Sequence, residues 1–189
     1  MTLVLICQSI RSALAVFLLI SSNAIAAFPS HCSADQYAIV DSWMGDVDAT
    51  NGGWRNTRNG KFLSLCANRK TEPFTKVTYR YGFLGQVEFE AVATPGAQFK
   101  IASLELVPRV GTDVVFFKKG NHTYYVSVAT GQGHGVGLDV FRGSKRVASH
   151  FSGNDEGRDY QLGPAEIDFM AHRSRSSVFI LEKPKHVLQ

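Results

Sequence analysis

The residue type best suited to proton transfer stands in an unusual glycine-rich segment, Gly131–Gly137 (GQGHGVG). Its histidine, His134, has a glycine on each side. Small neighbours leave an imidazole exposed, and the ordinary pKa of histidine suits general acid–base catalysis near neutral pH. Catalysis also needs an orienting carboxylate and a nucleophile, and spacing along the chain places neither. The alternating glycines equally fit close backbone packing, so His134 is the one catalytic candidate and no catalytic residue is assigned.

A second candidate site is a tryptophan set among glycine and arginine. The segment Asp46–Gly60 (DVDATNGGWRNTRNG) is polar and glycine-rich, which predicts a long loop. It carries Trp54, Arg55 and Arg58, and tryptophan and arginine are enriched at interface hot spots. The sequence therefore predicts a binding surface here. The alternative is a buried Trp54 that pins the loop to the rest of the fold.

Tyrosines in strand-like segments invite a carbohydrate-binding interpretation, because aromatic faces stack on sugar rings. They are Tyr79, Tyr81, Tyr124 and Tyr125. Alternation along a strand turns half of such rings into the core, so the pattern alone does not separate sugar binding from packing.

Metal and cofactor binding find no support in the spacing of possible ligands. The six histidines lack the intervals of a helical metal pair. His122 and His134 could converge across a sheet, but two ligands without a carboxylate make a poor zinc site. Asp46–Gly52 has oxygen ligands like those of a calcium loop but lacks the closing acidic residue. No metal and no cofactor is predicted.

The cysteines predict one structural bridge. Cys7 lies in the start of the chain, which leaves Cys32 and Cys66 as an even pair. In an oxidising compartment such a pair is expected to form a disulfide. Two free thiols or half of a metal site are the alternatives.

The elements that would position these residues are mostly strands. Lys76–Tyr81 and Gln86–Glu90 alternate polar and apolar residues around a turn at Gly82–Gly85. Gly120–Asn121 and Gly143–Ser144 are two further tight-turn signals. Ser33–Trp43 fits either a short helix or a strand.

The spacing of these strands predicts an all-β fold. Strands arriving every 8–12 residues are typical of a sandwich or barrel, here a single antiparallel domain of about 8–10 strands. Proline at a first helical position and early acidic residues predict a short C-terminal helix over Pro164–Met170.

The first 26 residues have the features of a signal peptide. An apolar run, Ser12–Ile20, precedes the small-x-small step Ala24–Ala26. The run is too short to span a bilayer, so we expect residues 1–26 to be a signal, 27–189 to be one β-rich domain without a membrane span, and the location to be periplasmic or secreted.

Composition excludes several classes of protein. The chain has 189 residues, 44% hydrophobic and 19% charged, with a formal net charge of +4. These proportions are those of a globular domain rather than a disordered or fibrous one. The basic residues are scattered rather than clustered, which argues against nucleic-acid binding.

From Phe62 to about His172, the chain resembles an uncharacterised family of small exported β-rich proteins of Gram-negative bacteria, mostly described as hypothetical. The matching segments are Ser64–Cys66, Tyr79–Gly82, Gly85–Glu88, Gly120–Asn121, Tyr125–Val126, Gly131–Gly133, Gly137–Val140, Lys145–Ala148 and Leu162–Pro164. Similar sequences often carry a further cysteine where Ser149–Phe151 stands here, so a second bridge is absent. The resemblance implies a secreted β-rich domain and brings no catalytic residue.

Three functions are open on this basis. The first is a secreted or periplasmic β-domain that binds a protein or cell-envelope macromolecule, as an inhibitor or immunity-type partner would, since loops on rigid scaffolds commonly carry recognition. The second is a small cell-envelope hydrolase or transferase with His134 as acid and base. The third is a carbohydrate- or peptidoglycan-binding module that uses Trp54.

Overall fold

The computed structural model describes residues 28–48, 55–107, 110–129, 135–152, 162–165 and 175–186. Within these ranges, side chains are described except at 46–48, 55–59, 105–107, 110 and 162–165. The predicted signal peptide lies outside the described residues, as do Trp54 and His134.

The secondary-structure elements within the described ranges are all strands, which confirms the predicted all-β class. The three predicted tight turns join hairpins β3–β4, β6–β7 and β8–β9. The strands are β1 (Tyr37–Asp48), β2 (Arg55–Ala67), β3 (Val77–Phe83), β4 (Gln86–Ala93), β5 (Phe99–Val107), β6 (Val110–Lys119), β7 (His122–Ala129), β8 (Gly135–Arg142), β9 (Lys145–Phe151), β10 (Leu162–Ala165) and β11 (Phe179–Leu181).

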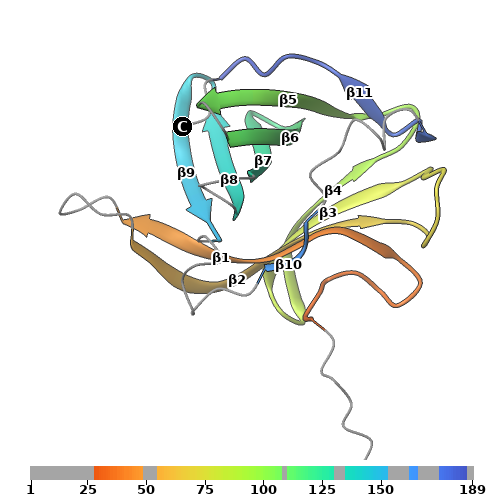
Figure 1. The fold of residues 1–189 in the computed structure, drawn as a ribbon, viewed down its shortest axis with the longest axis horizontal. Coiled ribbons are helices and arrows are strands. Elements are labelled where there is room, and N and C mark those ends of the chain that lie inside the picture. Colours follow the sequence, from red (N-terminus) through yellow and green to blue (C-terminus); the bar gives the residue numbers. More distant parts are fainter. Residues whose placement is uncertain are drawn as a thin grey trace, which may run out of the picture.

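All eleven strands belong to one mixed sheet that folds over on itself. Its order is β11-β5-β6-β7-β8-β9-β1-β2-β3-β4, and β10 pairs with β1 outside this path. β9 meets β1 at two residue pairs, Gly45↔Phe151 and Asp46↔His150. On either side of this narrow junction, the half formed by β5–β9 faces the half formed by β1–β4 (Figure 1).

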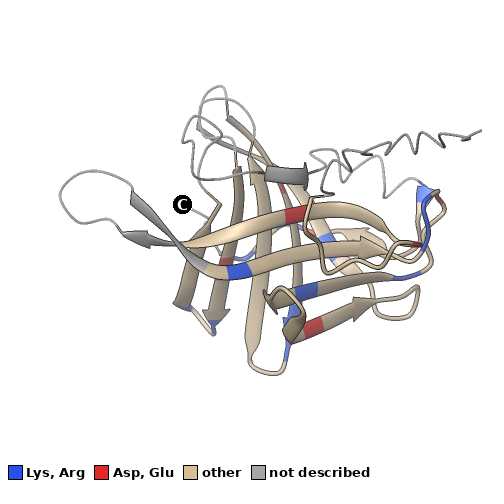
Figure 2. Ribbon diagram, turned by 90° about the horizontal axis from the view of Figure 1, so that it is seen from below, with Lys and Arg blue, Asp and Glu red and all other residues tan. Residues whose placement is uncertain are grey.

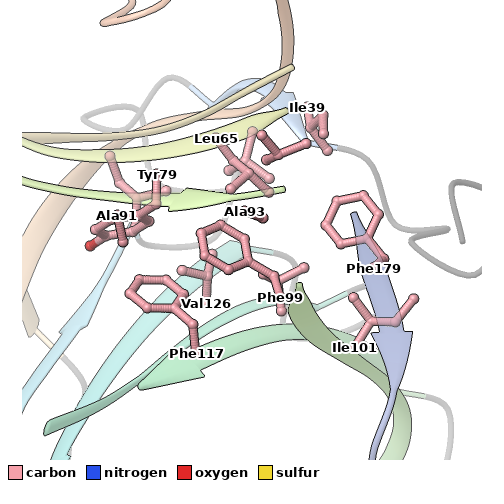
Figure 3. Packing of buried hydrophobic residues seen from close by; sticks show 14 of the residues in the cluster. Ile39, Leu65, Tyr79, Ala91, Ala93, Phe99, Ile101, Phe117, Val126 and Phe179 are labelled. Carbon is pink, nitrogen blue, oxygen red and sulfur yellow. The ribbon is translucent and has the colours of Figure 1, made fainter. Parts of the chain in front are cut away.

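The main core fills the space between these halves. Alternation along each strand turns every second side chain inward, and these inward positions carry valine, leucine, isoleucine and aromatic residues. Tyr79 from β3 and Phe117 from β6 point toward one another across the space, with ring centroids 5.2 Å apart (Figure 3). Phe99 stacks on Phe117 at 4.6 Å and continues the core toward β11.

Two short segments cross the outer faces of the sheet. Residues 28–33, the N-terminal strap, lie on β1–β3, where Phe28 contacts Phe62 at 5.8 Å between ring centroids. Residues 182–186, the C-terminal strap, run from β11 over the β5–β9 half (Figure 1). There His186 stacks on Phe141 at 4.2 Å and covers a second apolar cluster, made of Val114, Phe116, Tyr125 and Phe141.

The predicted disulfide is confirmed. Cys32 in the N-terminal strap is bonded to Cys66 in β2, with their Cα atoms 5.4 Å apart. The cross-link holds the start of the described chain onto the outer face of the sheet. Such a bond is compatible with an oxidising compartment.

The beginning of the predicted C-terminal helix is instead a strand. Leu162–Ala165 forms β10, which pairs with Val40 and Ser42 of β1. The unpaired edge of β1 needs hydrogen-bond partners there, and Pro164 is tolerated because β10 pairs on one side only. Tertiary pairing has overridden local helix propensity. Residues 166–170 of the predicted helix lie outside the described residues.

Charge and hydropathy add two observations about the described residues. Basic and acidic residues are interspersed along the strands rather than gathered on one element (Figure 2). Within the described part of the chain, no helix has the length and apolar character that a membrane crossing requires.

Candidate functional site

The arginines of the predicted binding loop lie in a strand. β1 extends to Asp48 and β2 begins at Arg55, so Asp48 pairs with Arg55 and Gly45 with Arg58. The predicted loop Asp46–Gly60 is therefore too long, because hairpin pairing continues through polar residues whose own strand propensity is low. Residues 49–54, including Trp54, and the side chains of Arg55 and Arg58 are not described, so their predicted binding role stays a prediction.

The glycine-rich segment is described from Gly135 onward, as the start of β8. A Cβ atom on Gly137 would lie 2.5 Å from the hydroxyl of Ser127 on β7. A side chain at 137 would therefore force the Ser127 hydroxyl to rotate away, which agrees with close packing of β8 against β7. His134 lies outside the described residues, and its catalytic role stays a prediction.

A pocket of about 280 Å³ opens between the two halves of the sheet, and we call it the aromatic pocket. Strands β3 and β4 supply one wall, and β7, β8 and β9 supply the other. Its lining residues are Tyr79, Tyr81, Phe89, His122, Tyr124, Leu138, Val140, Val147, Ala148 and His150. Four aromatic rings and two imidazoles thus line the same space.

The strand register explains why these side chains meet. Tyr81 pairs with Phe89 across β3 and β4, so both rings lie on the inner face. Leu138 pairs with His150 across β8 and β9 in the same way. Folding at the β1–β9 junction brings the two sets together, and ring contacts then bridge the halves.

Two ring stacks cross the aromatic pocket. Phe89 and Tyr124 stack with centroids 4.5 Å apart and planes 25° apart. Tyr81 and His150 stack at 6.0 Å and 26°. Stacking at these separations stabilises aromatic pairs beyond their area burial, so the pocket walls are held in place without a ligand.

Polar groups inside the pocket come from tyrosine and histidine. Burial raises the pKa of the Tyr124 hydroxyl further above neutrality. Like any tyrosine it is protonated at pH 7 and can donate a hydrogen bond. His122 is half-buried beside it, with ring centroids 6.4 Å apart. These two side chains can exchange hydrogen bonds with a bound group while the rings contact its apolar part.

The tip of the β3–β4 hairpin, which follows the pocket-lining Tyr81 and precedes the pocket-lining Phe89, carries exposed apolar side chains. Phe83, Leu84 and Val87 are 43%, 38% and 44% exposed, and Val147 on the opposite wall is 42% exposed. We call these four residues the apolar rim. Gly82 shapes the hairpin, because a Cβ there would lie 2.3 Å from the carbonyl oxygen of Gln86.

A lysine and a glutamate lie beside this rim. The Lys61 ammonium is paired with the Glu88 carboxylate. It also lies 5.5 Å from the ring centroids of both Tyr81 and Phe83. The rim therefore joins apolar surface to one neutralised charge pair.

A second polar cluster combines aspartate and serine but is closed to solvent. Ser64 and Ser30 donate hydrogen bonds to Asp41 Oδ1 at 2.5 and 2.9 Å. Asp41 is 2% exposed and Ser64 is fully buried. Burial raises the pKa of Asp41 to about 6 against the lowering effect of the two hydroxyls. The Ser64 hydroxyl is bonded to a carboxylate without an intervening imidazole, so this cluster is structural.

The sequence identified only some of the residues that line the aromatic pocket. Tyr125 packs in the outer cluster, whereas Tyr79, Tyr81 and Tyr124 line the pocket, and Tyr79 is also buried in the main core. Residue parity along β7 is the signal that separates Tyr124 from Tyr125. Among the described residues, no group of three or more histidine, cysteine, aspartate or glutamate side chains is arranged to hold a metal ion.

Comparison with known proteins does not add to this geometry. No protein-family model matches the chain, and no curated protein and no solved structure matches it significantly.

Proposed function

We propose that this protein is a secreted or periplasmic binding protein that recognises a partner protein through the aromatic pocket and the apolar rim. One observation carries the proposal: Phe83, Leu84, Val87 and Val147 are exposed beside a concave, aromatic-lined pocket. Exposed apolar side chains grouped near a concave pocket are typical of protein–protein contact sites. The partner would place an aromatic or aliphatic side chain between the pocket walls.

The proposed location rests on the start of the chain and on the disulfide. The small-x-small step after an apolar run favours export, and the Cys32–Cys66 bond is compatible with it. Membership of the exported β-rich family that the sequence resembles remains part of this proposal.

Site-specific crosslinking tests the proposal. A photoreactive phenylalanine analogue at Phe83 should capture one protein from an extract of the source cells. Ile180 on β11 is the matched control, because it is 44% exposed and lies on the opposite edge of the sheet. Equal capture from both positions, or capture from neither, would contradict the proposed site.

Affinity measurements with the captured protein then show how much the apolar rim contributes to binding. Phe83→Ala should weaken binding by about tenfold to thirtyfold, the range of an interface hot spot. Ile180→Ala should change the dissociation constant less than about twofold. Because Phe83 is exposed, its truncation should leave the melting temperature nearly unchanged, which separates lost binding from lost folding.

A carbohydrate ligand is the second candidate, favoured by the ring faces and by the Tyr124 and His122 polar groups. Titration calorimetry with soluble peptidoglycan fragments tests it. Tyr124→Phe should then weaken binding by about tenfold, since it removes a hydroxyl and keeps the ring. Binding unaffected by this change would exclude the pocket as the sugar site.

The hydrolase or transferase alternative depends on His134. Its test is the His134→Ala variant, which should lose an envelope-directed activity while keeping its melting temperature. A fall of several degrees would instead assign His134 a structural role.

For the architecture, we propose an open two-layer sandwich rather than a closed barrel. Among the described strands, β4 and β11 end the sheet and each pairs on one side only. This leaves a free strand edge at β4.

A further inference from the structure

The outer edge of β4 offers unpaired backbone groups to solvent. Among the described residues, β4 pairs with β3 and with no second strand. An exposed sheet edge of this kind is a template for pairing with another chain. The hydrogen bonds of the turn after β4 show which of its backbone groups point outward.

The turn after β4 shows the direction of these groups. The Thr94 amide donates to the Ala97 carbonyl at 3.1 Å, and the Ala97 amide donates to the Thr94 carbonyl at 3.0 Å. Thr94 therefore directs its backbone groups away from β3. Along a strand, the backbone N–H and C=O groups of successive residues point to alternate edges. The backbone groups of Val92 and Glu90 therefore also point away from β3.

Lys119 gives independent evidence for this direction. Its ammonium group, reaching from the end of β6, donates a hydrogen bond to the backbone carbonyl of Glu90. It also lies 4.6 Å from the ring centroid of Phe89. A lysine side chain thus takes the place at the β4 edge that the amide of a neighbouring strand would occupy.

A groove of about 530 Å³ runs beside this edge. It exists because β11 occupies the edge of β5 that β4 would otherwise meet: Phe99 donates to the Val178 carbonyl at 3.0 Å. β4 and β5 therefore diverge after the Thr94–Ala97 turn. The groove is lined by Glu90, Ala91, Val92, Ala97, Gln98, Phe99, Lys100, Phe117, Lys118 and Lys119.

The groove has an excess of positive charge. Lys100 is paired with Glu182 at 2.7 Å, and Glu90 with Arg80 at 2.9 Å. Lys118 and Lys119 form no ion pair with any carboxylate in the described part of the chain. Two uncompensated ammonium groups beside an open strand edge favour an acidic ligand with a free backbone.

We propose that β4 accepts an extended, acidic segment of a partner protein as an added strand. An amide of the segment bonds to the Glu90 carbonyl in place of Lys119, and its carbonyl accepts from the Val92 amide. Lys118 and Lys119 then pair with its carboxylates. Main-chain bonds supply affinity and side chains supply specificity in this mode of recognition. The site is separate from the aromatic pocket and does not depend on it.

The probe is a capped hexapeptide of alternating aspartate and valine, titrated against the full chain by fluorescence anisotropy. Saturable binding weakened by salt is expected, because surface charge pairs are screened. A peptide with N-methyl groups on alternate amides should bind at least tenfold more weakly, since it lacks the donors. A lysine–valine peptide should show the same loss. Equal binding of the N-methylated peptide, or no binding up to about 1 mM aspartate peptide, would overturn the proposal.

Variants of the protein locate the binding. Val92→Pro removes the outward amide of an edge residue, which an edge strand tolerates, and should lower affinity at least tenfold. Val92→Thr keeps the amide and is the matched control. Lys118→Gln should lower affinity severalfold and reduce the salt dependence. Unchanged binding by Val92→Pro would overturn the site, while loss of binding with Phe83→Ala alone would assign the peptide to the apolar rim instead.

Discussion

The two straps cover equivalent outer faces of the folded sheet, yet they are held by different chemistry. The N-terminal strap is joined to β2 by the Cys32–Cys66 bond and by the buried Asp41 cluster. The C-terminal strap is held by noncovalent contacts: the Glu182 amide donates to the Ile101 carbonyl, Glu182 pairs with Lys100, and the His186 imidazole makes two hydrogen bonds. His186 accepts from the Tyr125 hydroxyl at 2.7 Å and donates to the Gly143 carbonyl at 2.9 Å, since a carbonyl can only accept.

The difference shows which half of the molecule is fixed and which can adapt. Covalent and buried polar contacts tie the strap on β1–β3 to the core of that half. Arg80 adds to them by donating to the His31 carbonyl at 2.8 Å. The described contacts of the strap on β5–β9 are noncovalent and involve partly exposed strap side chains, and such contacts open at lower free energy.

Removal of the disulfide should have the largest effect. The bonded cysteines are 34 residues apart, and loop entropy for that length corresponds to about 3.5–4 kcal/mol. Cys32→Ala/Cys66→Ala should lower the free energy of unfolding by this amount in a urea titration. Reduction of the parent protein should reproduce the loss. A variant as stable as the parent would mean that noncovalent contacts hold the strap.

Asp41 should make the same strap sensitive to pH. Burial raises its pKa from 3.8 to about 6, so folding favours the protonated form. The contribution of Asp41 to stability is then greatest below pH 4 and falls by about 3 kcal/mol as pH rises through about 6. Asp41→Asn should abolish this fall, because an amide oxygen still accepts from Ser30 and Ser64.

Unfolding of the two proteins at several pH values measures the effect of Asp41. The variant should exceed the parent in stability at pH 8 and match it near pH 4. Asp35→Asn is the control: a hydrogen bond from Ser33 lowers the pKa of that exposed carboxyl, so it titrates below this range. Parallel stability curves for Asp41→Asn and the parent would contradict the assignment.

His186 should matter less, and its two roles can be separated. His186→Ala removes two hydrogen bonds and a ring stack, for an expected loss of about 2 kcal/mol. His186→Phe keeps the stack on Phe141 and should recover about half of it. Hydrogen exchange should show faster exchange over residues 182–186 in the alanine variant, with β1–β3 unchanged. Equal loss in both variants would mean that the ring stack contributes nothing.

Local features of the sequence predicted local features of the fold. Alternation along Lys76–Tyr81 and the turn at Gly120–Asn121 depend on neighbouring residues, and the structure confirms both. The Cys32–Cys66 pair followed from counting. Pro164 led to a wrong helix prediction because β1, the strand with which Leu162–Ala165 pairs, lies far away in the sequence.

The candidate site depended on contacts that no local pattern contains. Tyr81, Tyr124 and His150 lie on three strands and meet because the sheet folds at the β1–β9 junction. The same is true of the β4 edge, which is free because β11 takes the neighbouring place beside β5. Sequence parity could select inward rings, but only the order of strands decides which of them line an opening.

The smallest effect should come from the ion pair that begins the C-terminal strap. Lys100 and Glu182 are bonded at 2.7 Å with side chains 40% and 39% exposed, and exposed pairs contribute at most about 1 kcal/mol. A double-mutant cycle with Lys100→Met and Glu182→Gln should give a coupling below this value that falls further in 1 M salt. A coupling of 2 kcal/mol or more that resists salt would give this strap a second firm attachment. It would thereby remove the contrast with its N-terminal counterpart, because the strap would then open no more easily than the covalently held one.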